Sequence, residues 1–125
     1  MTTFGVFALS ALLGAVGAVA RYAVTAVLPK GAEATGLLIV NASGSLLAGA
    51  ALGLAHIDAI DSSTALALLA FAAGFTTLST TAVAAAQSIG RGQFWRGLGI
   101  AALHIVGGVM CALVGYNVVG AFLVA

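Results

Sequence analysis

Five hydroxyl side chains within six residues lie in the middle of an apolar segment. The segment runs from about residue 64 to residue 89, and Gly74 comes just before the hydroxyls. At membrane depth, polar side chains are retained where they contact protein or water rather than lipid. The cluster therefore predicts contact with something polar or ionic. Its members are Thr76, Thr77, Ser79, Thr80 and Thr81.

A purely structural interpretation of these hydroxyls stays open. Ser and Thr in membrane helices commonly donate to carbonyl groups of their own helix, and we favour that role for Ser43 or Ser45 alone. In the cluster, all five hydroxyls within six residues would have to donate to carbonyls of their own helix. We therefore expect a kink hinged at Gly74, with the alcohols turned away from lipid.

The other polar side chains inside apolar segments are cations or hydrogen-bond donors. Arg21 could extend to the membrane interface or attract anions at a pore mouth. The amide of Asn41 can donate two hydrogen bonds, so a role toward an anion and a helix–helix bond are equally open. His104 alone is more often satisfied inside a bundle than used as a ligand. Because no acidic side chain lies within these segments, their lining favours anions.

Composition places the chain in a membrane. Of its 125 residues, 62% are hydrophobic and only 6% are charged, against about 25% charged in soluble domains. Crossing a membrane takes about 20 apolar residues, and four segments qualify. We therefore expect one all-α domain over residues 1–125, with its first apolar segment retained rather than cleaved as a signal peptide. The spans are about 4–28, 36–55, 64–89 and 95–122.

All four basic residues lie on one side of such a bundle. Arg21 ends the first span, Lys30 lies in the first loop, and Arg91 and Arg96 flank the third loop. Basic residues are enriched on the cytoplasmic side of membranes. We therefore expect both of these loops in the cytoplasm and both termini outside. The motif at residues 49–53, Gly-Ala-Ala-Leu-Gly, fits either tight packing in one bundle or self-association.

Several function classes are disfavoured. Glu33, Asp58 and Asp61 fall in predicted loops, where Asp61 could cap the third span. A proton-driven exporter commonly needs a carboxylate within a span. No nucleophile–base spacing, phosphate-binding loop or cluster of metal ligands is visible, so we expect no enzyme. The single Cys111 is interpreted as a buried, inert thiol.

Three motifs resemble the Fluc (CrcB) family of small fluoride channels. Residues 13–22, ending in Arg-Tyr, are similar to its first-span pattern Gly-Gly-x-x-Gly-Ala-x-x-Arg-Tyr. Residues 41–49 are similar to Asn-x-x-Gly-Ser-Phe-x-x-Gly. Residues 70–81 are similar to Gly-Phe-x-Gly-Gly-Phe-Thr-Thr-Phe-Ser-Thr-Phe. The motifs occur in the family's order and in the corresponding spans, so the resemblance covers nearly the whole chain.

The resemblance implies an antiparallel, dual-topology dimer whose third helix is broken mid-membrane. Two narrow pores would let fluoride leave a bacterial cell passively across its plasma membrane. A central sodium ion would be held between subunits by the backbone carbonyls of Ala73 and Thr76. Arg21 would line a vestibule and Asn41 would face the pore. The residues assigned to the pore are Arg21, Asn41, Phe75, Thr77, Ser79, Thr80 and His104.

Leu78 and Thr81 stand where the family has two pore phenylalanines, whose ring edges carry partial positive charge. Ala73 replaces a glycine of the family's sodium site, and His104 matches a fourth-span tyrosine. Since the basic residues favour one orientation, we expect this chain to pair with a homologous subunit inserted the opposite way. The rival is an active homodimer. A small multidrug or metabolite exporter and a non-conducting assembly subunit are the alternative functions.

Overall fold

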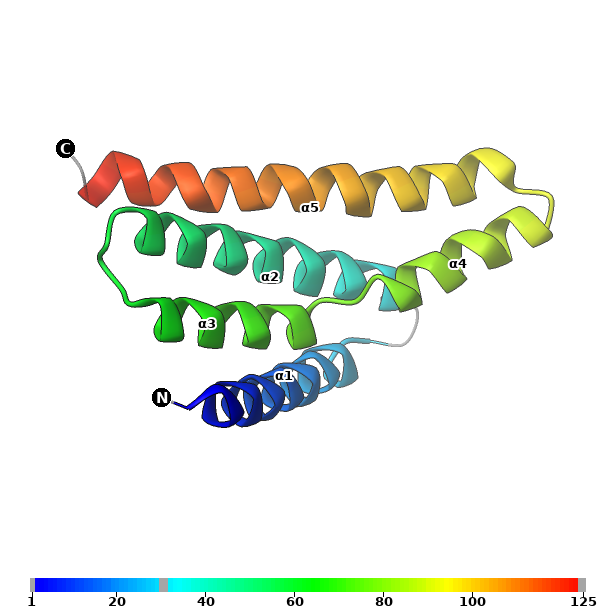
Figure 1. Ribbon diagram of the computed structural model, residues 1–125. Coiled ribbons are helices and arrows are strands. Elements are labelled where there is room, and N and C mark those ends of the chain that lie inside the picture. Colours follow the sequence, from blue (N-terminus) through cyan, green and yellow to red (C-terminus); the bar gives the residue numbers. More distant parts are fainter. Residues whose placement is uncertain (1, 30–31, 124–125) are drawn as a thin grey trace.

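The fold is built from helices packed side by side (Figure 1). A computed structural model describes residues 2–29 and 32–123, and no strand occurs in that part of the chain. Four stretches of it are long and apolar enough to cross a membrane, which confirms the predicted four-span, all-α fold. The helices are α1 (Thr3–Ala26), α2 (Glu33–His56), α3 (Ser62–Phe75), α4 (Ser79–Gly90) and α5 (Phe94–Leu123).

Two helices begin with side-chain caps. The Thr2 hydroxyl accepts a hydrogen bond from the Gly5 amide at 3.3 Å. An Asp61 carboxylate oxygen accepts one from the Thr64 amide at 2.8 Å, which confirms Asp61 as the predicted cap of α3. The hydrogen bonds from Thr64 favour the ionised carboxylate and so hold the pKa of Asp61 below its ordinary value.

Glycine lets α2 and α5 pack with their backbones in contact. A methyl group added at Gly49 would collide with the backbone of Ala112, and one added at Gly115 would collide with the backbone of Leu46. Gly53 lies less tightly against α5, where an added methyl carbon would be 2.9 Å from the Tyr116 carbonyl oxygen. The small-residue motif over residues 49–53 therefore serves packing within this one bundle, which was one of its two interpretations.

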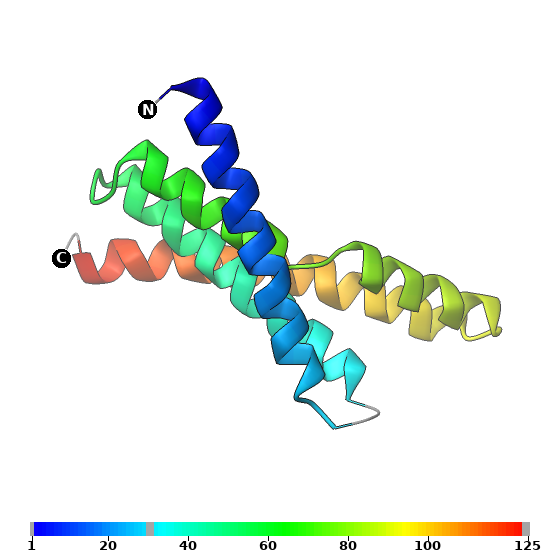
Figure 2. The ribbon, with the colours of Figure 1, turned by 90° about the horizontal axis from the view of Figure 1, so that it is seen from below.

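A second glycine contact joins α1 to α3. The two helices cross at a steep angle (Figure 2), and a methyl group added at Gly74 would collide with the backbone of Gly14. The predicted hinge at Gly74 is wrong, because Gly74 lies inside α3 and the helix ends only after Phe75. Gly74 is needed for the approach of α1 and not for the bend.

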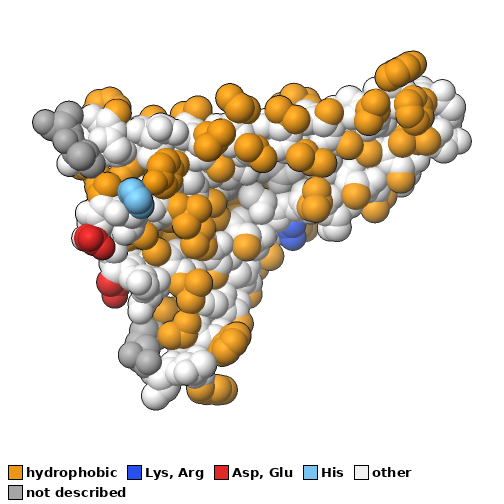
Figure 3. All heavy atoms as spheres, turned by 45° about the horizontal axis from the view of Figure 1, so that its top comes forward, with side chains coloured by type: hydrophobic (Ala, Val, Ile, Leu, Met, Phe, Trp, Pro, Cys, Tyr) orange, Lys and Arg blue, Asp and Glu red, His pale blue; other side chains and the backbone are white. Residues whose placement is uncertain are grey.

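The outer surface carries many apolar side chains, and its acidic side chains lie at one end. Figure 3 shows hydrophobic side chains spread over the face, with the acidic side chains gathered at one end of it. Both acidic residues of the α2–α3 loop, Asp58 and Asp61, are exposed. This loop and both chain ends lie at the same end of the bundle (Figure 1). Lys30 lies outside the described residues, and the cytoplasmic assignment stays a prediction.

Replacing Gly49 by alanine should destabilise the fold, since the new methyl group has no room beside the backbone of Ala112. Overpacking of this kind costs about 1–3 kcal/mol. Gly107→Ala is the matched control, because a methyl group there meets nothing within 4 Å. Thermal unfolding in detergent should show a lower midpoint for Gly49→Ala only. Equal midpoints for the two variants would contradict the close packing of α2 on α5.

Candidate functional site at the break in the third span

The third span is two helices joined by three non-helical residues. The last helical backbone hydrogen bond of α3 runs from the Thr76 amide to the Ala72 carbonyl, at 2.9 Å. Thr76 is extended, with φ −79° and ψ 165°, and α4 begins at Ser79. The carboxyl end of α3 carries partial negative charge and the amino end of α4 carries partial positive charge. The break lies in the third span, where a broken helix was expected, and it presents both signs of partial charge at one place.

Asn41 of α2 pairs both backbone groups of Thr77 in the break. Its Nδ2 donates to the Thr77 carbonyl at 3.0 Å, and its Oδ1 accepts from the Thr77 amide at 2.7 Å. Nδ2 also donates to the Thr81 hydroxyl at 3.3 Å. Asn41 is 8% exposed and Thr77 is 6% exposed. The amide thus makes the helix–helix hydrogen bonds that were one of its two interpretations.

The Thr77 side chain forms hydrogen bonds with groups at the start of α4. Its Oγ1 accepts a hydrogen bond from the Thr80 amide at 3.3 Å, which is the bond that an N-cap residue makes. The same oxygen lies 2.9 Å from the Thr80 hydroxyl and 3.4 Å from the Ser79 hydroxyl. These contacts pair a buried alcohol and one amide at the amino end of α4.

Some of the five hydroxyls have the structural role, bonding to nearby backbone, and others remain free to contact something polar or ionic. The Thr76 hydroxyl donates to the Ala73 carbonyl at 3.3 Å, and the Thr81 hydroxyl donates to the Thr77 carbonyl at 3.2 Å. Both are local bonds to backbone, as the structural interpretation expects. Thr77 and Thr81 are buried, whereas Ser79 and Thr80 are exposed on this chain. The cluster therefore stabilises the break and also leaves alcohols at its surface.

Arg21 reaches the break from α1. Its Nη1 donates to the Thr76 carbonyl at 3.0 Å, which brings a positive charge to the negative end of α3. Arg21 also lines a cavity of about 340 Å³ with Thr77 and Thr80. No acidic residue is among the described residues that line it. A guanidinium, alcohols and a helix amino end together suit an anion.

The sequence interpretation did not single out two polar residues of this cavity. Tyr22 and Thr25 line it beside Arg21. Thr25 lies four residues after Arg21, and its hydroxyl donates to the Arg21 carbonyl at 3.0 Å. The spacing was a usable signal, because residues four apart share one face of a helix.

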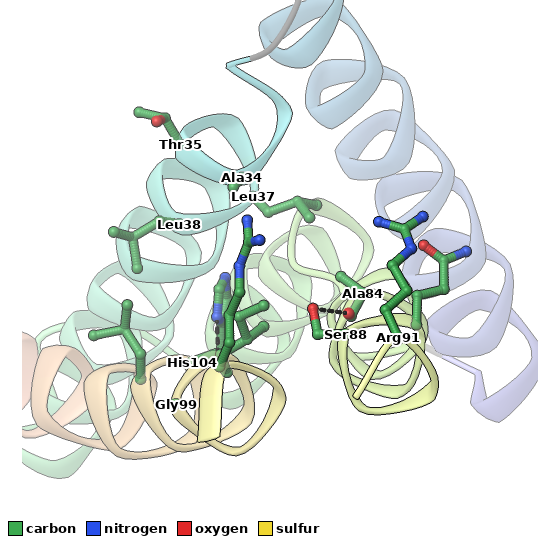
Figure 4. Close-up of a pocket in the computed structure, with 13 residues that line it drawn as sticks. Ala34, Thr35, Leu37, Leu38, Ala84, Ser88, Arg91, Gly99 and His104 are labelled. Carbon is green, nitrogen blue, oxygen red and sulfur yellow. Dashed lines mark hydrogen bonds between the residues drawn. The ribbon is translucent and has the colours of Figure 1, made fainter. Parts of the chain in front are cut away.

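Other predicted pore residues lie away from this cavity. The Phe75 ring stacks on Phe71, with centroids 5.7 Å apart, and Ser79 is exposed outside it. His104 lines a larger groove between α2, α4 and α5 (Figure 4). Leu37 lines both the groove and the cavity, so the two adjoin. The structure thus groups Arg21, Thr77 and Thr80, with Asn41 bonded to Thr77 from behind.

Comparison with known proteins places this geometry in a family. Residues 8–116 match the family described as CrcB-like protein, Camphor Resistance (CrcB), and the matched region includes all three motifs. The chain belongs to the CrcB family. The CrcB resemblance expected from the motifs is thereby confirmed.

One curated CrcB relative shares substantial sequence with the chain. It is the fluoride-specific ion channel FluC of Haemophilus ducreyi, which is 33% identical over 82 residues. The match covers 66% of this chain and 64% of the relative.

The sodium site that the CrcB resemblance implies would use the carbonyls of Ala73 and Thr76. The break releases the Ala73 carbonyl from the helical pattern, because the Thr77 amide bonds to Asn41 instead. Neutral oxygens at the negative end of α3 suit a hard cation. Carbonyl oxygens are the class of donor that sodium takes. The Ala73 carbonyl already accepts from the Thr76 hydroxyl and the Thr76 carbonyl from the Arg21 guanidinium, so a second subunit would have to supply further oxygens.

Asn41→Ala should destabilise this CrcB protein, because the buried Thr77 amide loses its partner. An unsatisfied buried donor costs about 1–3 kcal/mol. Ser43→Ala is the matched control on the same helix, since the Ser43 hydroxyl is exposed and bonds to its own helix at Ile39. The free energy of unfolding, measured by denaturant titration in detergent, should fall for the first variant only. If both variants lose the same amount, Asn41 does not hold the break.

Proposed function

We propose that this chain is a subunit of a fluoride channel, through which fluoride leaves a cell passively down its gradient. The observation that carries this proposal is the cavity at the amino end of α4, where Arg21, Thr77 and Thr80 meet. A family relative that carries the name of a fluoride-specific channel supports it.

Fluoride is small and strongly hydrated, so its passage needs donors that replace water. Arg21 supplies a fixed positive charge, and the hydroxyls of Thr77 and Thr80 supply donors beside it. The described acidic side chains, Asp58 and Asp61, lie in the α2–α3 loop. A small anion therefore meets attraction at the break, and none of the described carboxylates lies there. The same arrangement disfavours a proton-driven exporter, which commonly relies on a carboxylate within a span.

A second subunit in the opposite orientation would complete the pore. The side chain of Leu78 is 69% exposed at the break, so a partner can cover it. Thr81 is 2% exposed and bonded to Asn41 and Thr77, which leaves it unable to replace a pore phenylalanine. In this proposal the partner supplies the aromatic ring edges, and sodium lies between the subunits at Ala73 and Thr76.

The partner is a homologue with the opposite insertion preference. Arg91 directly follows α4 and Arg96 lies in the first turn of α5, and such a basic end favours the cytoplasm. The complex would lie in a bacterial plasma membrane, with both termini of this chain outside. A homodimer would need the same chain to insert in both directions despite this basic end.

Fluoride efflux from liposomes tests the proposal. The chain is reconstituted alone and with a homologous subunit into liposomes loaded with sodium fluoride, and a fluoride electrode follows the release. The pair should release fluoride at least about tenfold faster than protein-free liposomes and should not release chloride. Fast efflux by the chain alone would refute the need for a partner. No fluoride efflux with either preparation would refute the channel.

An Arg21→Gln arm connects the efflux to the cavity. Without the positive charge of Arg21, fluoride passage should slow about tenfold, which corresponds to a loss of about 1.4 kcal/mol of attraction for the anion. Asn117→Ala is the control, because Asn117 is exposed on α5 and its amide donates to Leu113 at 2.7 Å. Efflux driven only by a proton gradient would favour an exporter instead. If adding this chain raises the efflux of its partner subunit and Arg21→Gln leaves that efflux unchanged, the result would favour an assembly subunit.

A further inference from the structure

Gly44 of α2 leaves a notch that the side chain of Thr76 fills. Gly44 is buried, and a methyl group added there would collide with Cγ2, the methyl carbon of Thr76. The added group would also lie 3.3 Å from the Phe75 ring and 3.5 Å from the Ala72 carbonyl oxygen. Gly44 comes three residues after Asn41, on the same face of α2. The helix therefore contacts the break at two points, through the hydrogen bonds of Asn41 and through the notch at Gly44.

The Thr76 side chain can leave this notch only with the loss of a hydrogen bond. Its methyl group lies in the notch while its hydroxyl donates to the Ala73 carbonyl at 3.3 Å. Both groups are attached to the same Cβ atom, so a rotation that moves the methyl group out also turns the hydroxyl away from Ala73. The alternative is a movement of the Thr76 backbone. A larger residue at position 44 therefore disturbs Thr76 by either route.

The backbone of Thr76 also holds Arg21. The Thr76 carbonyl accepts from Nη1 of Arg21 at 3.0 Å, and Arg21 lines the cavity with Thr77 and Thr80. Gly44 is not among the residues of that cavity. It lines, together with Thr76, a separate hollow of about 250 Å³ between α2 and α3. Thr76 thus connects the two places, with its side chain beside Gly44 and its carbonyl bonded to Arg21.

We propose that Gly44 is a positioning residue for the anion path, because it seats Thr76, whose carbonyl then holds the Arg21 guanidinium at the cavity. A guanidinium carries five N–H donors, so one can stay on the carbonyl while others face an anion. Gly44 acts through Thr76 and contacts no anion itself. This inference rests on the proposed function, since it names the residue that sets the position of the charge in the proposed fluoride path.

A double-mutant cycle tests this role by fluoride efflux from liposomes that contain the chain and its partner. Gly44→Ala should slow efflux at least about threefold, because a displaced Arg21 attracts the anion less. Thr76→Ser removes the methyl group that would collide and keeps the hydroxyl and the carbonyl. Gly44→Ala/Thr76→Ser should therefore come within about twofold of Thr76→Ser alone. Gly107→Ala should leave efflux unchanged, since a methyl group there meets nothing within 4 Å.

Thr76→Val is the matched control for the rescue, because valine keeps a methyl group in the notch. Gly44→Ala/Thr76→Val should stay at least about threefold slower than Thr76→Val alone. The same loss in both double variants would overturn the proposal. If Gly44→Ala alone does not fold, thermal unfolding of the double variants decides, each against its own single variant at Thr76. The serine pair should lose less than the valine pair, and equal losses would again overturn the proposal.

Solid-state NMR separates this inference from the channel itself. Dipolar couplings between arginine side-chain nitrogens and the carbonyl carbon at position 76 should detect the Arg21 contact in the wild-type chain. The contact should be lost in Gly44→Ala and return in Gly44→Ala/Thr76→Ser. Arg96 is an internal control, because its Nη1 donates to Gln93 at 3.0 Å. An unchanged Arg21 contact in Gly44→Ala refutes the inference and leaves the channel standing. The expected NMR pattern without any efflux supports the seat and refutes the channel.

Discussion

Backbone polar groups in apolar surroundings must be paired, and this constraint governs the third span. The break between α3 and α4 removes Thr77 from the helical pattern at a position where it is 6% exposed. Asn41 restores the pairing by accepting from the Thr77 amide and donating to the Thr77 carbonyl. A side-chain amide can replace a backbone partner in this way because it carries one acceptor and two donors. The broken helix is stable only while α2 holds Asn41 beside it.

The remaining packing fixes α2 and α1 against the break. Contacts between backbones at Gly49 and Gly115 hold α2 on α5, and the contact of Gly74 with Gly14 holds α1 on α3. The second contact lets Arg21 reach the Thr76 carbonyl from α1. A positive charge and the amino end of α4 then meet in one cavity, which is the basis for the proposed passage of fluoride. The groove with His104 adjoins it, since Leu37 lines both.

Hydropathy and turn residues were enough to predict the spans, since each apolar segment exceeds the length of a membrane crossing. The hydroxyl cluster also marked the broken span, and Asp61 marked the start of α3. The hinge was misplaced at Gly74, because a glycine that permits close helix contact looks the same in a sequence as one that permits a bend. The pairing of Asn41 with Thr77 joins residues 36 positions apart, and local patterns carry no signal for it.

The backbone conformation at Thr76 and Thr77 in a lipid bilayer tests the central claim most directly. Solid-state NMR of the chain labelled at its threonines gives torsion angles through carbon chemical shifts, and Asn41→Ala provides the comparison. We expect extended torsions at Thr76, near the φ of −79° and ψ of 165° described above, and their loss in the variant. Helical torsions from Ser62 to Gly90 without interruption in the wild-type chain would contradict the account.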